Sequence, residues 1–171
     1  MKIKTQITKY NSGEISRIRQ FIEGLGLKFQ PSYDLHARLD GDSMPCNLRI
    51  LPNEIPGPNG DKCAKAKNRI PNATLFRCAI GGGDGIQIDP YGNMFACNLI
   101  RKPDFNLLKF DIDYATDKLL SLVRNRKFVT DSRCNGYSLR EKCNWCPGRA
   151  YLEKGDTEAP IEYYCKLARL M

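Results

Sequence analysis

The chain has 171 residues, of which 42% are hydrophobic and 27% are charged, and its formal net charge at pH 7 is +8. This composition is close to that of an average globular protein and argues against global disorder, and the length suits one domain or one domain with a fragment of another. No stretch approaches the roughly 18 consecutive apolar residues of a transmembrane helix, and the N-terminus lacks the apolar core of a secretory signal.

Residues 1–30 have the pattern of a strand, a helix and a second strand. Lys2 to Thr8 alternates in polarity, which is typical of a strand. Asn11, followed by Glu14, predicts the N-cap and capping box of the helix that comes next. One β-α-β unit of this size cannot bury a sheet by itself, so we expect it to be the edge of something larger.

Residues 31–75 are rich in proline and glycine, which predicts a connector. Regular patterns return after it. Residues 85–99 predict a β-hairpin that turns at Gly92. Helices are predicted over residues 113–129, over residues 147–154 and from Pro160 onward.

Six of the eight cysteines form a spaced array in the second half of the chain: Cys78, Cys97, Cys134, Cys143, Cys146 and Cys165. Thiolates from distant parts of a sequence hold either disulfides or a metal centre. Because no export signal is present, we expect a cytoplasmic, reducing environment, in which structural disulfides are rare. Soft sulfur ligands suit zinc or iron–sulfur clusters. Zinc ribbons usually pair two Cys-x-x-Cys knuckles and this chain has one, which disfavours zinc but leaves it open.

The order of these residues resembles the SPASM domain, the C-terminal auxiliary-cluster domain of many radical SAM enzymes. The resemblance covers about residues 75–171. It includes local phrases such as Ile88–Asn93 and Cys143–Ala150 as well as the cysteine spacing, which reads Cys78-x13-Gly92-x4-Cys97, then Cys134-x2-Tyr137-x5-Cys143-x2-Cys146, then Cys165.

The resemblance implies a fold and a domain organisation. The expected fold class is α+β, with a small SPASM-like domain of a β-hairpin and helices around iron–sulfur clusters. Residues 1–45 are similar to the last βα unit of a radical SAM barrel, and residues 46–74 would connect this remnant to the cluster domain.

The resemblance also implies one or two [4Fe–4S] clusters. By position, the first cluster would take Cys78, Cys97 and Cys146. The second would take Cys134, Cys143 and Cys165.

Each cluster would then have three thiolates and an undecided fourth ligand. Tyr137 stands where the family has a second-cluster cysteine, and Asp84 stands where some members have an additional cysteine for the first. Either residue could ligate through oxygen, Cys63 or Cys46 could complete a cluster from the connector, one iron could stay open for a substrate or small thiol, or one cluster could be lost.

The chain has no Cys-x3-Cys-x2-Cys loop, which holds the S-adenosylmethionine cluster in radical SAM enzymes. It should therefore not cleave S-adenosylmethionine alone, and whether it acts as an enzyme is left open. It could be a truncated product, a split-gene half or a free-standing cluster carrier. The expected partners are a radical SAM barrel chain, with which S-adenosylmethionine would enter as a cofactor, or a peptide or protein substrate.

The alternative is a zinc-stapled module that binds nucleic acid or protein. Its basic charge would attract nucleic acid. However, no aromatic residues alternate with the basic ones, as a single-strand binding platform would require. We therefore do not expect nucleic acid as the partner.

Overall fold

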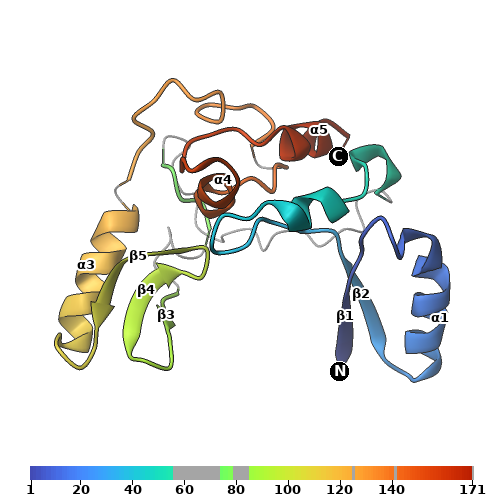
Figure 1. Ribbon diagram of the computed structural model, residues 1–171, viewed down its shortest axis with the longest axis horizontal. Helices are drawn as coiled ribbons and strands as arrows, with labels where there is room; N and C mark the ends of the chain where they lie inside the picture. Colours follow the sequence, from blue (N-terminus) through green and yellow to red (C-terminus); the bar gives the residue numbers. More distant parts are fainter. Residues whose placement is uncertain (56–73, 79–84, 125, 141, 171) are drawn as a thin grey trace.

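The computed structural model describes residues 1–55, 74–78, 85–124, 126–140 and 142–170. These residues form a mixed α+β fold, which confirms the predicted class. In chain order the elements are β1 (Lys2–Gln6), the 3-10 turn η1 (Ser12–Glu14), α1 (Ile15–Gly24), β2 (Lys28–Ser32), the 3-10 turns η2 (Met44–Leu48) and η3 (Pro52–Glu54), β3 (Gln87–Ile88), β4 (Asn93–Cys97), β5 (Ile100–Asn106), α3 (Ile112–Arg124), α4 (Pro147–Lys154) and α5 (Glu162–Leu170). Figure 1 shows two small sheets at opposite ends of the molecule, with α4 and α5 between them.

The N-terminal unit is the predicted strand, helix and strand. β1 and β2 pair in parallel, from Lys2 opposite Lys28 to Gln6 opposite Ser32. Helix α1 connects the two strands and places Ile22 in the interior. The periodicity of apolar residues was therefore sufficient to predict this part.

The capping box predicted at Asn11 and Glu14 is wrong. The Asn11 Oδ1 atom accepts a hydrogen bond from the backbone N–H of Thr8 at 2.7 Å, and the Asn11 amide donates to the carbonyl of Gln6 at 3.0 Å. Neither Asn11 nor Glu14 makes a side-chain cap hydrogen bond to the helix. Asparagine can bond to nearby backbone outside a helix, and here it closes the turn that follows β1.

The second sheet is antiparallel, in the order β3-β4-β5. The predicted hairpin corresponds to β3 and β4, and Gly92 has a φ of +78°, as its turn requires. The sequence analysis missed β5, because Pro103 and the neighbouring charged residues have low strand propensity. Helix α3 packs Leu119 against Met94 of this sheet.

Helix α3 ends at Arg124, before the predicted end at residue 129. The chain beyond it is held by other partners. The backbone N–H of Leu75 donates to the carbonyl of Arg126 at 2.8 Å, and the buried Glu158 carboxylate accepts the backbone N–H of Val129 at 2.9 Å. These contacts replace the helical hydrogen bonds that the sequence pattern predicted.

The last helix also differs slightly from the prediction. It begins at Glu162 rather than within the turn that contains Pro160. Tyr164 of this helix belongs to the main core, and Cys165 is buried as well. That core comprises the buried residues Leu75, Phe76, Ala96, Val123, Cys134, Trp145, Ala150, Ile161 and Tyr164.

A buried ion pair joins the segment after β2 to this core. The guanidinium of Arg49 donates to both carboxylate oxygens of Glu153 on α4, and its Nη1–Oε2 distance is 3.1 Å. The two side chains are only 7% and 8% exposed. Arg49 also donates to the carbonyl of Leu35 at 2.6 Å and lies over the ring of Tyr164 on α5.

Asp34 makes a second connection between the same segments. Its carboxylate pairs with Arg149 of α4, and its Oδ1 atom lies 3.1 Å from the Tyr164 hydroxyl. Both α4 and α5 are therefore tied to residues 34–49. No helix within the described ranges is long and apolar enough to cross a membrane.

We expect the substitution Arg49→Met to lower the free energy of unfolding by about 3–5 kcal/mol, because it leaves the Glu153 carboxylate buried without its cation. Chemical denaturation, followed by circular dichroism and by the fluorescence of the single tryptophan, measures this effect. The control is Arg17→Met, which removes the exposed pair with Glu14 and should cost less than about 1 kcal/mol. Equal unfolding midpoints for the two variants would contradict the role given to the buried pair.

Candidate metal centre

The thiols of Cys78, Cys97 and Cys146 are electrostatic neighbours. Burial raises the pKa of the Cys146 thiol, and negative charge on Cys97 and Cys78 raises it further, while Arg149 opposes the shift. The three residues come from separate places in the chain. Cys97 ends β4, and Cys146 directly precedes α4.

Gly148 allows α4 to approach the turn between β4 and β5. A Cβ atom at this position would lie 2.7 Å from the Cβ atom of Leu99, which is closer than side chains tolerate. Leu99 in turn donates its backbone N–H to the sulfur of Cys97 at 3.4 Å. The small residue thus helps to bring Cys146 to the turn that carries Cys97.

Cys134, Cys143 and Cys165 form a second group. Burial raises the pKa of Cys143 to about 11, and negative charge on Cys165 and Cys134 contributes to this shift. Burial also raises the pKa of Cys134, with Cys165 again among the causes. The Cys143 thiol donates to the carbonyl of Tyr164, with a sulfur–oxygen distance of 3.6 Å.

Backbone N–H groups point hydrogens at two of these sulfurs. The backbone N–H of Trp145 lowers the pKa of Cys143, and that of Arg149 lowers the pKa of Cys146, although burial outweighs each effect. Hydrogen bonds of this kind stabilise a thiolate and orient it toward a metal.

A small pocket lies beside the second group. It is lined by Arg133, Cys134, Tyr137, Cys165 and Arg169. The Tyr137 hydroxyl is buried and has no hydrogen-bond partner within the described residues. The lining residues of the pocket thus include two cysteines, one tyrosine and two arginines.

A buried cation, Arg140, acts on the second group. Arg140 is 9% exposed and donates to the carbonyls of Thr74 and Leu75 at 2.7 and 3.1 Å. Burial, with a contribution from Arg77, lowers its pKa to about 10, so it stays charged at neutral pH. Its charge acts on the thiols of Cys134 and Cys143 and favours their thiolate forms.

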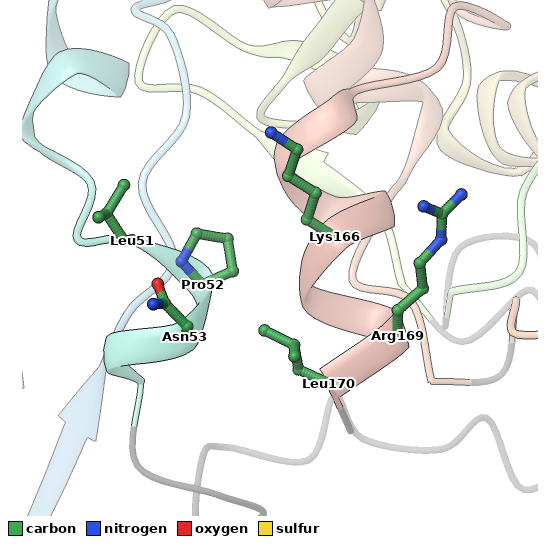
Figure 2. A pocket seen from close by; sticks show the side chains of 6 residues that line it. All are labelled: Leu51, Pro52, Asn53, Lys166, Arg169 and Leu170. Carbon is green, nitrogen blue, oxygen red and sulfur yellow. The ribbon is translucent and has the colours of Figure 1, made fainter.

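Another pocket lies between η3 and α5, where it is lined by Lys166, Arg169 and Leu170. Figure 2 shows Leu170 pointing toward η3, while the guanidinium of Arg169 points away from it. Leu51, Pro52 and Asn53 form its other wall. Arg169 lines this pocket as well as the one beside Cys165. The two pockets therefore share Arg169 of α5 as a lining residue.

The remaining predicted ligands have different places. Cys63 and Asp84 lie outside the described residues. Cys46 belongs to η2, where its electrostatic neighbours are Arg49, Glu153 and Asp42 rather than the six thiols of the array. The structure therefore gives Cys46 no position beside either group.

The described residues contain no group of three or more histidine, cysteine, aspartate or glutamate side chains arranged to hold a single metal ion. Within each group the thiols interact electrostatically. They do not converge on one point. The sequence analysis also missed Arg133, Arg140 and Arg169 as parts of the site. Nothing in their spacing distinguishes them from surface arginines.

Comparisons of the chain with protein-family models, with curated proteins and with solved structures find no match. The function is therefore argued from the residues and their geometry.

We expect the substitution Gly148→Ala to lower the free energy of unfolding by about 1–3 kcal/mol, because the new methyl group must displace Leu99. The control is Gly13→Ala, where an added Cβ meets nothing within 4 Å and the change should stay within about 0.5 kcal/mol. Denaturation curves for both variants give the measurement. An unchanged Gly148→Ala protein would show that α4 and the β4–β5 turn can separate without cost.

The pKa of Cys143 predicts slow alkylation of the metal-free protein. Only the thiolate reacts. Raising the pKa from 9.0 to about 11 should therefore cut the rate below pH 9 about a hundredfold relative to the chain in urea. The rate in the folded protein should keep rising to about pH 11. Tandem mass spectrometry of protein labelled at several pH values reads this residue separately, and a plateau near pH 9 in the folded protein would disprove the burial argument.

Proposed function

We propose that this chain is an iron–sulfur protein, whose residues 75–171 form a SPASM-type domain that holds one or two [4Fe–4S] clusters. What supports the proposal is the electrostatic interaction among the thiols, since Cys78 and Cys97 act on Cys146, and Cys134 and Cys165 act on Cys143. Cys78, Cys97 and Cys146 would hold one cluster. Cys134, Cys143 and Cys165 would hold the other.

The surroundings of the thiols fit a cluster. Hydrogen-bond donors reach sulfurs in both groups, as the Leu99 N–H does at Cys97. Cations are placed to offset anionic thiolates, as Arg140 is at the second group. Sulfur hydrogen bonds, net charge and burial are the features by which proteins set cluster potentials. When bound, the clusters would supply one-electron transfer or an iron that anchors a substrate.

Zinc fits the described groups less well. A structural zinc ion takes four ligands in a tetrahedron around one point. The described thiols come in threes, and the chain has one Cys-x-x-Cys knuckle where zinc ribbons usually have two. The single histidine, His36, has its Nδ1 atom 2.8 Å from the carbonyl of Ala37 and belongs to the segment after β2.

The N-terminal unit supports a role beside a partner chain. β1 and β2 form a sheet of only two parallel strands, and parallel sheets are normally covered on both faces. Phe21 and Leu25 of this unit are 68% and 56% exposed. We include in the proposal that residues 1–45 dock on a radical SAM barrel chain, which would bind S-adenosylmethionine, and that the clusters serve its peptide or protein substrate.

Anaerobic reconstitution with iron and sulfide tests the cluster assignment. The wild-type protein should turn brown and bind about eight irons for two clusters, or about four for one. Cys97→Ser and Cys143→Ser should each remove one cluster, and the double variant should bind almost no iron. Iron and sulfide analysis of purified protein gives the counts.

The matched controls are Cys46→Ser and Cys63→Ser, which should leave the iron content unchanged. Iron loss in Cys63→Ser equal to that in Cys143→Ser would show that the connector supplies a ligand. A colourless protein with stoichiometric zinc would overturn the iron–sulfur proposal and favour a zinc-stapled module.

A further inference from the structure

Two turns lie side by side at one end of the second sheet. The backbone N–H of Leu107 donates to the carbonyl of Gly92 at 2.8 Å, and the Asn106 amide donates to the carbonyl of Tyr91 at 3.3 Å. Leu108 lies close to the same turn, since a Cβ atom at Gly92 would be 3.9 Å from its Cγ atom. In Figure 1 both turns lie at the end of the sheet that points away from α4 and α5.

This end of the sheet carries a group of exposed apolar side chains. Phe105 packs against the small core of the sheet, and the ring of Phe110 meets it edge-on, with 5.5 Å between the ring centres. The rings of Phe110 and Tyr114 are stacked at 5.9 Å. We call the exposed part of this group the apolar tip. It comprises Tyr91, Leu108, Phe110, Ile112 and Tyr114, which are 79%, 87%, 42%, 50% and 48% exposed.

The apolar tip is large for a surface that stays in water. Aromatic side chains bury about 150–250 Å² each when they are covered, so five large apolar side chains that are roughly half exposed or more leave on the order of 500 Å² uncovered. Isolated apolar side chains are normal on a protein surface, but a contiguous patch of this size marks an interaction site. Together with a polar rim, the tip approaches the about 800 Å² per partner that a standard protein interface buries.

The charge around the tip favours a second copy of the chain as the partner. Residues 85–118 carry five carboxylates and four basic side chains, a net charge of −1, whereas the whole chain has +8. Two copies of a basic chain repel each other least where their local charge is close to zero. Lys109 and Asp111 flank Phe110 in the chain, and the Lys118 Nζ atom lies 5.5 Å from the centre of the Tyr114 ring. The rim therefore has both signs of charge, as a surface that complements itself requires.

We propose that the apolar tip is the contact surface of a symmetric homodimer, in which the tips of two copies cover each other. In such a dimer the same patch serves on both sides, so the basic side chains of each rim meet carboxylates of the other copy. This inference goes beyond the proposed function and does not depend on bound clusters. The N-terminal unit lies at the opposite end of the molecule (Figure 1), so the dimer leaves it uncovered for a partner chain.

Sedimentation equilibrium of the full chain, both reconstituted and metal-free, tests the dimer. The wild-type protein should have twice the monomer mass at high concentration and should dissociate on dilution. Tyr91→Glu and Leu108→Glu should each raise the dimer dissociation constant about thirtyfold or more, because each places a carboxylate in an apolar contact. Higher salt should strengthen the wild-type dimer, since it screens the repulsion between two chains of charge +8.

The matched control is Tyr10→Glu in the N-terminal unit. Tyr10 is 77% exposed, nearly as much as Tyr91, and the substitution changes the net charge by the same amount. Its dimer dissociation constant should stay within about twofold of the wild-type value. Circular dichroism checks that each variant folds. Tyr91→Ser and Leu108→Ser, which add no charge, should also weaken the dimer, but by less than the glutamate variants.

The outcomes test the dimer separately from the clusters. A wild-type chain that stays monomeric at every concentration overturns the homodimer, and so does a monomer that uses the tip to bind lipid vesicles or another protein. A dimer that Tyr91→Glu and Leu108→Glu leave intact, or that Tyr10→Glu weakens equally, overturns the tip as the contact surface. None of these outcomes bears on the cluster assignment, which the iron content of the cysteine variants decides.

Discussion

The buried ion pair between Arg49 and Glu153 is the contact on which the arrangement of α4 and α5 depends. Glu153 belongs to α4, and the same guanidinium lies against the rings of Tyr163 and Tyr164 on α5. One side chain from the connector therefore touches both helices. Burial of these charges is costly unless each is paired, so the geometry that satisfies them is narrowly defined. Cys146 directly precedes α4, and Cys165 lies on α5. The ion pair therefore helps to position one cysteine of each group.

The two groups of thiols differ in their electrostatic surroundings. Arg149 is the nearby cation at the first group, where it opposes the rise in the pKa of Cys146. Arg133 and Arg140 both act on Cys134 in the second group. Positive charge beside a cluster stabilises its more reduced, more negative state. Two clusters in these places would therefore have different reduction potentials, which is a condition for directional electron transfer between them.

Much of the local structure could be predicted from the sequence, because it follows from local patterns. The strand, helix and strand of residues 1–32 come from periodicity, and Pro147 with Gly155 marks the two ends of α4. β5 could not be predicted, since Pro103 and its charged neighbours join the sheet only through pairing with β4. The capping role expected of Asn11 failed for a related reason, because its side chain had two competing backbone targets.

The candidate site, like the fold, could be predicted from the sequence only in part. The resemblance to the SPASM domain predicted which thiols belong together, and a departure from the pattern of that domain drew attention to Tyr137. The burial of its hydroxyl without a partner, and its place in one pocket with Arg169 of α5, depend on the fold. No local pattern marks an arginine on α5 as the neighbour of Tyr137.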